Sequence, residues 1–202
     1  MAYKPGPKVP QEMLIEMNPA TNIDRSVLRG MLIAVAAMIV LVSASNYLVQ
    51  FPLSDWLTWG AITYPATFLV TDLTNRAYGP RRARQVVYIG FALAVICSLW
   101  LATPRIALAS GSAFLVAQLL DVHVFDRLRG GRWWQAPLAS SSIGSAVDTA
   151  LFFTLAFAGT AVPFVTLALG DFAVKLALAL LFLSPFRLLM AVVRPMGTAR
   201  PS

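Results

Sequence analysis

The 202-residue sequence has few charges, one cysteine and one histidine, and these shortages exclude several classes of protein. Charged residues make up 12% of the chain and hydrophobic residues 58%, which is too apolar for a soluble domain of this length. The single Cys97 excludes a disulfide framework and a thiolate metal cluster. One histidine, His123, and the lack of HExxH and nucleophile-elbow motifs argue against an enzyme, and we expect no cofactor. The composition instead predicts an all-α polytopic membrane protein.

Six apolar stretches come close to the length of about 20 residues with which a helix crosses a bilayer. We therefore expect six transmembrane helices, in a domain that covers residues 27–190. Residues 1–26 are rich in proline and charge, so they are predicted to form a disordered cytoplasmic tail, and residues 191–202 a second one. The six predicted spans are residues 27–49, 59–78, 86–102, 106–125, 136–158 and 164–183.

Positive charge is distributed unevenly between the two ends of these spans. Fourteen of the 16 Lys and Arg residues lie in the tails, in the loops after the second and fourth spans, or at the span ends next to them. Arg105 stands alone in a loop on the other side, and Lys175 lies within the sixth span. Cytoplasmic loops carry an excess of Lys and Arg, so both termini are predicted to be cytoplasmic. Insertion and anionic lipid account for the net charge of +7, and no nucleic-acid partner is expected.

The second predicted span contains an aspartate, Asp72, well inside an apolar segment. A charge near the centre of a bilayer costs about 2.5 to 3.5 kcal/mol on insertion scales, so this side chain should face the protein interior. At helical spacing, Tyr64 and Phe68 lie on the same stripe as Asp72. Two aromatic rings next to a carboxylate are suited to a flat ligand that donates hydrogen bonds.

Other polar residues within the spans are further candidates for a binding site. Asp148 has no basic residue within reach in sequence, so we expect it to meet a partner from another helix or a substrate. Asp171 and Lys175 are four residues apart, which is the spacing of an intrahelical ion pair, and mutual neutralisation is favoured over contact with a ligand. The remaining candidates are Asn75, Gln118 and Asp121, together with Asn46 and Gln50, for which capping at the membrane interface is an equal alternative.

Several of these stretches resemble the queuosine precursor transporter family, whose members are bacterial inner-membrane proteins also grouped as vitamin-uptake-like transporters. The resemblance covers the first five spans, and it implies uptake of the 7-deazaguanines preQ0 and preQ1, which are salvaged for the modified tRNA nucleoside queuosine. It also implies a six-helix fold similar to the substrate-binding components of energy-coupling-factor transporters. The matching stretches are SNYLVQ (45–50), WGA (59–61), FLVTDLTNRAYG (68–79), DVHVFDRLR (121–129) and WWQAPLASS (133–141).

A deazaguanine fits the chemistry of the candidate residues. Its ring N–H and its exocyclic amino group lie side by side, so one carboxylate can accept both hydrogen bonds. Asp72, Asp121 or Asp148 could serve, while the ring stacks on aromatic side chains and an amide reads the carbonyl. PreQ1 also carries an amine that is positive at neutral pH, which a second carboxylate would stabilise.

Two alternatives of another class stay open. The chain could be the substrate-binding subunit of an ATP-driven vitamin-type transporter for another small heterocycle; because it has no nucleotide-binding motif, an energising partner would then supply the energy. An intramembrane enzyme is the less favoured alternative. Facilitated diffusion, proton coupling and ATP coupling are all compatible with these residues, and so are a monomer and a homo-oligomer.

Overall fold

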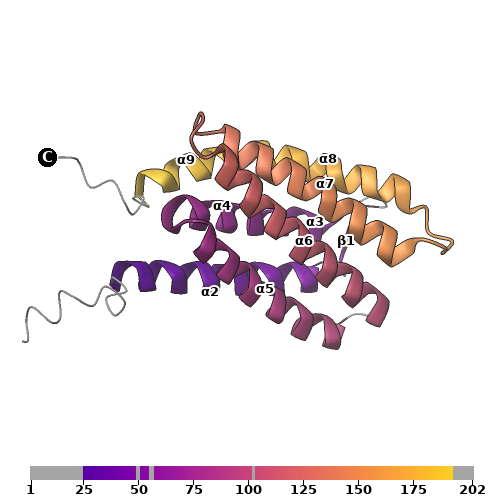
Figure 1. Ribbon diagram of the computed structural model, residues 1–202. Coiled ribbons are helices and arrows are strands. Elements are labelled where there is room, and N and C mark those ends of the chain that lie inside the picture. Colours follow the sequence, from indigo (N-terminus) through magenta and orange to yellow (C-terminus); the bar gives the residue numbers. More distant parts are fainter. Residues whose placement is uncertain (1–24, 49–50, 55–56, 102, 193–202) are drawn as a thin grey trace, which may run out of the picture.

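The computed structural model describes residues 25–48, 51–54, 57–101 and 103–192. Most of each predicted tail, namely residues 1–24 and 193–202, lies outside the described residues. The described chain is an elongated bundle of helices that run up and down in turn (Figure 1). Five helices are long, three are short, and a two-stranded antiparallel hairpin follows the first helix. The elements are α2 (Arg25–Leu48), β1 (Pro52–Ser54), β2 (Leu57–Thr58), α3 (Trp59–Thr63), α4 (Ala66–Tyr78), α5 (Pro80–Leu101), α6 (Pro104–Leu128), α7 (Gln135–Phe157), α8 (Phe164–Leu181) and α9 (Leu183–Val192).

The predicted fold class, an all-α polytopic membrane protein, is confirmed. Four helical segments of the described chain are long and apolar enough to cross a membrane: Arg25–Ser45, Pro104–Leu128, Gln135–Phe157 and Phe164–Ala191. Large apolar side chains such as Trp100 and Leu108 are exposed on the outside of the bundle, as expected for surfaces that face lipid. The total of six spans stays a prediction.

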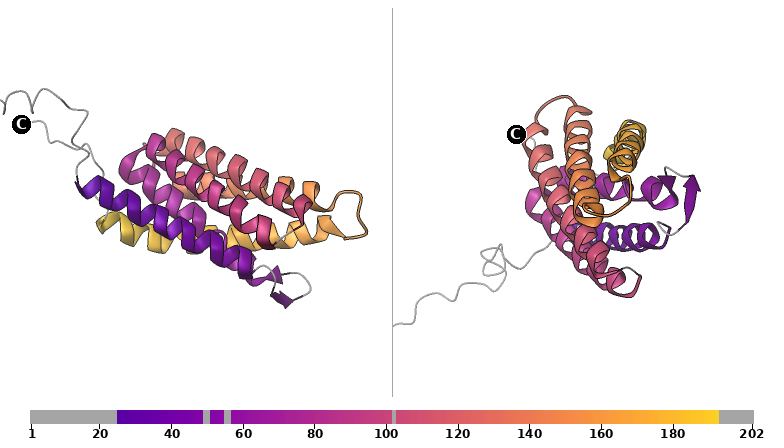
Figure 2. Two further views of the ribbon diagram at one scale, coloured as in Figure 1. Left: turned by 90° about the horizontal axis from the view of Figure 1, so that it is seen from below. Right: turned by 90° about the vertical axis from the view of Figure 1, so that its right-hand side faces the viewer.

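The basic loops gather at one end of the bundle. The start of α2, the α4–α5 and α6–α7 connections and α9 lie there, whereas the hairpin and the α7–α8 loop lie at the opposite end (Figures 1 and 2). At that opposite end, the Arg105 guanidinium donates hydrogen bonds to the carbonyl oxygens of Leu155 and Ala158. Arg105 therefore caps the last turn of α7, which gives this isolated cation a structural role.

The second predicted span differs from the prediction, because it is broken into two helices. α3 ends at Thr63 and α4 begins at Ala66, with Tyr64 and Pro65 between them. Proline lacks a backbone N–H and disfavours the helical conformation of the residue before it, which accounts for a break at this position. The expected stripe is therefore split: Phe68 and Asp72 are buried on α4, while Tyr64 projects from the break.

α4 is the central element of the fold, since it packs against α2, α5, α6, α7 and α9. The main apolar core lies between α2, α5 and α6, where Met38, Val86 and Phe114 are buried. On α7, Gly144 permits a close approach to α4: a Cβ there would lie 2.8 Å from a ring carbon of Phe68. Small residues at helix contacts let polar side chains on α4, α6 and α7 come within hydrogen-bonding distance.

The predicted sixth span ends at Leu183, but the structure adds a separate helix, α9, after a turn at Phe182. Pro185 lies in the first turn of α9, where the missing N–H of proline has no helical partner to lose. Phe186 is buried against Phe125, with ring centroids 6.1 Å apart. The turn at Phe182 is thereby held over the end of the bundle that carries the basic loops.

Candidate functional site

Two groups of buried polar side chains lie next to each other in the bundle interior. We call the first the lysine cluster; it consists of Tyr64, Asp148, Thr149, Asp171 and Lys175. We call the second the acid pair; it consists of Asp72 on α4 and Asp121 on α6. Both groups contain carboxylates that are shielded from solvent, yet their surroundings differ.

In the lysine cluster, the Lys175 ammonium group lies between two carboxylates. Its Nζ donates to Asp148 Oδ2 at 2.8 Å and to Thr149 Oγ1 at 3.1 Å, and it also forms an ion pair with Asp171. The Tyr64 hydroxyl donates to Asp148 Oδ1 at 2.9 Å. The predicted ion pair between Asp171 and Lys175 is confirmed. Asp148 finds its partner on another helix, which is one of the two outcomes expected from the sequence.

In the acid pair, the carboxylates of Asp72 on α4 and Asp121 on α6 come close to each other, and Ser140 of α7 lies near both. Ionised carboxylates only accept hydrogen bonds, so this contact becomes a hydrogen bond only when one group carries a proton. Asp72 accepts hydrogen bonds from Ser140, at 3.1 Å, and Ser141, at 3.3 Å. Neither oxygen of Asp121 forms a hydrogen bond with the described residues in this conformation, although the Ser140 hydroxyl, which donates to Asp72, lies near it. Within that part of the chain, no Lys or Arg forms a salt bridge with either carboxylate.

The two candidate amides next to the acid pair differ in how their polar atoms are used. Gln118 donates to Thr67 Oγ1 at 2.9 Å and accepts from Thr71 Oγ1 at 2.7 Å, so two threonines of α4 hold it in place. Asn75 donates to the Val122 carbonyl oxygen at 2.9 Å, but its own Oδ1 has no partner among the described residues. Asn75 is therefore the amide with a free acceptor, whereas Gln118 supports the packing of α4 on α6.

Sequence reasoning missed the hydroxyl groups of Ser140, Thr67 and Thr71, which orient the candidate side chains. The sequence did carry a signal that α4 and α6 face each other, because each of these helices carries one acid and one amide three residues apart. The order is acid then amide on α4 and amide then acid on α6: Asp72 with Asn75, and Gln118 with Asp121. Residues three apart lie on one face of a helix, so each helix presents an acid and an amide together.

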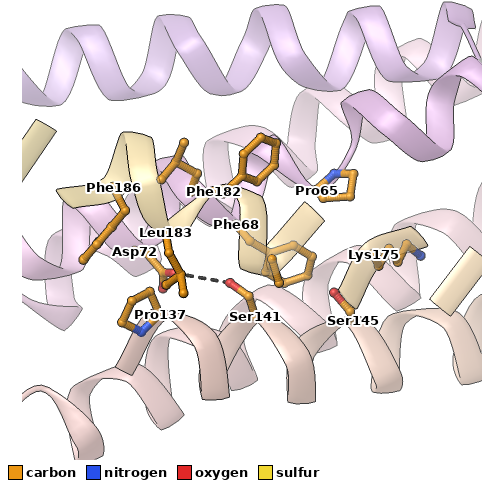
Figure 3. A pocket seen from close by; sticks show the side chains of 12 residues that line it. Pro65, Phe68, Asp72, Pro137, Ser141, Ser145, Lys175, Phe182, Leu183 and Phe186 are labelled. Atoms are coloured by element: carbon orange, nitrogen blue, oxygen red, sulfur yellow. Dashed lines mark hydrogen bonds between the residues drawn. The ribbon is translucent and has the colours of Figure 1, made fainter. Parts of the chain in front are cut away.

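The aromatic candidates connect the two groups, because Tyr64 belongs to the lysine cluster and Phe68 lies on the same helix as Asp72. The Tyr64 ring is 6.2 Å from both the Phe68 and the Phe114 ring, with edge-to-face geometry in each case. Phe68 also lines a narrow pocket with Asp72, Ser141, Ser145 and Lys175 (Figure 3). The three rings pack on one another in this conformation, and Phe68 is the one that lines the space beside the Asp72 carboxylate.

The turn between α8 and α9 lines one side of the pocket, with Phe182, Leu183 and Phe186 (Figure 3). Its cavity volume is about 10 Å³, which leaves room for about one water molecule. A bicyclic ligand therefore does not fit beside Asp72 in this conformation. Of the other candidates, Asn46 lies in α2, but its side chain falls outside the described residues, as does Gln50.

Residues 58–190 match the family described as "Putative vitamin uptake transporter". The chain belongs to this family. It is 37% identical over 176 residues to the "Queuosine precursor transporter" of Escherichia coli K12, which covers 73% of this chain and 80% of that protein. It is 35% identical over 188 residues to the "Probable queuosine precursor transporter" of Haemophilus influenzae, with the same coverage. The corresponding Bacillus subtilis protein is 30% identical over 130 residues, which covers 50% of this chain and 57% of that protein.

No solved structure matches the chain. Membership of the vitamin uptake transporter family makes the protein a multi-pass membrane transporter rather than an enzyme.

In this transporter, hydrogen bonds join α4 to α6 at the basic end. They connect residues 68–79 with residues 121–129, two of the stretches that resemble the family. The Arg76 guanidinium donates to the Arg129 carbonyl oxygen at 3.0 Å, and Arg129 donates back to the carbonyl oxygens of Asn75 and Arg76. Arg129 also forms a surface salt bridge with Asp126. These hydrogen bonds lie about one turn beyond Asp72 on α4 and about two turns beyond Asp121 on α6, and they hold the two helices together at the basic end.

Proposed function

We propose that this protein imports queuosine precursors, the 7-deazaguanines preQ0 and preQ1, across a bacterial inner membrane, with both termini in the cytoplasm. The printed names of the relatives support this substrate class. The observation that carries the proposal is the buried Asp121 carboxylate, whose two oxygens have no hydrogen-bond partner among the described residues. A buried acceptor without a partner costs about 1–3 kcal/mol, and more when it is charged, so it calls for a ligand that donates hydrogen bonds.

The guanine-like edge of the substrate supplies the donors that Asp121 lacks. The ring N–H and the exocyclic amino group point the same way, so each donates to one oxygen of the same carboxylate. Asp72, held by Ser140 and Ser141, lies beside this contact. The free Oδ1 of Asn75 accepts a further N–H group of the heterocycle. Hydrogen bonds to a charged group contribute about 1.5–3 kcal/mol each, enough to select this edge over bases that lack it.

Entry to the site requires an opening motion. The α8–α9 turn covers Asp72, and it contacts the rest of the bundle through a few apolar side chains such as Phe186. Displacement of this turn gives the substrate access to the carboxylates. When the turn returns, it excludes water, and the charged hydrogen bonds to the substrate become stronger.

The test is queuosine formation in tRNA of cells that cannot synthesise queuosine precursors and lack their own transporter. Low concentrations of preQ0 or preQ1 are supplied outside, with and without this protein. We expect queuosine only when the protein is present. Unmodified tRNA despite confirmed membrane insertion would overturn the proposed substrate class.

A matched pair of variants tests the site in the same assay. Asp121→Asn removes the charge of the acid pair's free acceptor, and Asp126→Asn makes the same substitution five residues further along α6, at the exposed basic end. We expect queuosine to be lost with Asp121→Asn and retained with Asp126→Asn. Equal queuosine in both variants, at equal amounts of protein, would remove Asp121 from the site.

A further inference from the structure

The pocket beside the acid pair extends along α7 toward the lysine cluster. Ser141 donates to Asp72 at one end, and Asp148 binds Lys175 at the other. Seven residues separate Ser141 from Asp148, which corresponds to about 10 Å along a helix. In Figure 3, Asp72, Ser141, Ser145 and Lys175 follow one another along the pocket. This length is comparable to the long dimension of a bicyclic base that carries a small substituent.

The lysine cluster has no hydrogen-bond donor to spare for a ligand. The three protons of the Lys175 ammonium group are directed to Asp148, Thr149 and Asp171. The Tyr64 hydroxyl also donates within the cluster, to Asp148. With two carboxylates and one ammonium group, the cluster has a formal net charge of −1. It therefore acts on the far end of a bound substrate mainly through its negative field.

The arginines at the basic end of the bundle do not cancel the negative field of the lysine cluster. Arg76 and Arg129 are bound to each other's backbone at the basic end, and Arg187 stacks on Trp133 with 4.6 Å between its guanidinium carbon and the ring centroid. The arginines of α2 and the start of α5, such as Arg29 and Arg84, are exposed. Lys175 is thus the one cation among the described residues that lines the pocket, and its cluster is already net negative.

We propose that the lysine cluster determines specificity at the 7-substituent of the deazaguanine, and that it favours the cationic aminomethyl group of preQ1 over the neutral nitrile of preQ0. This inference rests on the proposed function, because it places the guanine-like edge at the acid pair. The 7-substituent lies at the opposite end of the ring system from the exocyclic amino group. With that edge at the acid pair, whose Asp72 lines the pocket, the substituent points along α7 toward Lys175 and its two carboxylates.

The experiment compares KM values for initial uptake of labelled preQ1 and preQ0 into right-side-out membrane vesicles. In each variant the two substrates are measured side by side, so their KM ratio does not depend on the amount of inserted protein. We expect the wild type to have the lower KM for preQ1. Asp171→Asn removes one negative charge but keeps an acceptor for Thr149, and it should shift the KM ratio about tenfold toward preQ0.

A second neutralising variant and a control complete the set. Asp148→Asn should shift the KM ratio in the same direction as Asp171→Asn. Asp126→Asn, which removes a charge at the exposed basic end, should leave the ratio at its wild-type value. If Asp171→Asn does not insert, the wild-type ratio and Asp148→Asn still decide.

The outcomes separate this inference from the proposed function. If wild-type vesicles take up neither substrate above empty vesicles, the proposed function itself fails. If both substrates enter but the wild type shows no preference for preQ1, the specificity inference is wrong while the transport function stands. The inference is equally wrong if the neutralising variants transport with an unchanged KM ratio.

Discussion

The lysine cluster and the acid pair lie in the same apolar interior, yet they solve the problem of a buried carboxylate differently. In the lysine cluster, Asp148 and Asp171 share one ammonium group, and a tyrosine and a threonine hydroxyl supply further donors. In the acid pair, Asp121 forms no hydrogen bond and no salt bridge with the described residues. The charges of the lysine cluster compensate one another without a ligand, whereas the oxygens of Asp121 remain open to hydrogen bonds from one.

The largest effect on this comparison is expected when the shared cation, Lys175, is removed. Lys175→Met leaves two buried carboxylates without their partner, and breaking a buried ion pair in this way costs about 3–5 kcal/mol. We expect little folded protein in the membrane and a large drop in thermal stability in detergent. Unchanged stability would show that the cluster does not hold the helices together.

A triple variant tests the reason for that loss. Combining Lys175→Met with Asp148→Asn and Asp171→Asn leaves no uncompensated charge, and an ion pair replaced by neutral groups of similar size is often close to neutral in stability. We expect the triple variant to recover much of the stability that Lys175→Met loses. Failure to recover would point to packing rather than charge as the cause.

The acid pair should behave in the opposite way, losing transport but not stability. Asp121→Asn removes charge-assisted hydrogen bonds to the substrate worth about 1.5–3 kcal/mol, so uptake at low substrate concentration should fall about tenfold or more. Asp72→Asn should have a similar effect. Both variants should insert normally, with thermal stability equal to or above that of the wild type, because a buried charge is removed. Normal uptake by both would remove the acid pair from the transport mechanism.

A smaller effect is expected at the tyrosine that links the helix break to the lysine cluster. Tyr64→Phe removes one donor to Asp148, which still binds Lys175. The loss of one hydrogen bond amounts to about 1 kcal/mol, visible as a drop of a few degrees in melting temperature. Uptake should persist, and its abolition at normal stability would place Tyr64 in contact with the substrate.

The smallest effect is expected for the exposed carboxylate of α6. Asp126 and Arg129 form a salt bridge with 40% and 35% of their side-chain surfaces exposed, and such pairs contribute about 0–1 kcal/mol. Asp126→Asn should therefore leave stability and uptake close to wild type, which makes it the matched control for Asp121→Asn. A strong transport defect would mean that the basic end takes part in translocation.

Local features of the sequence were sufficient for part of the fold and part of the site. The apolar lengths predicted helices that the structure contains at nearly the same bounds, and the spacing of Asp171 and Lys175 predicted their ion pair. The break at Tyr64 and Pro65 and the separate helix α9 were missed. In both places the run stays apolar, so hydropathy does not register the interruption, and the proline within the run is the local signal that marks it.

The sequence by itself determined the membrane class, the positions of the helices and the basic character of one set of loops. These properties depend on residues close together in the chain, through hydropathy, helical periodicity and charge. Only the tertiary structure decided that Asp148 meets Lys175, that Gln118 is held by threonines of α4, and that Asp72 meets Asp121 with free oxygens between two helices. Such pairings depend on the rotation and register of packed helices, which residues far apart in the chain settle together.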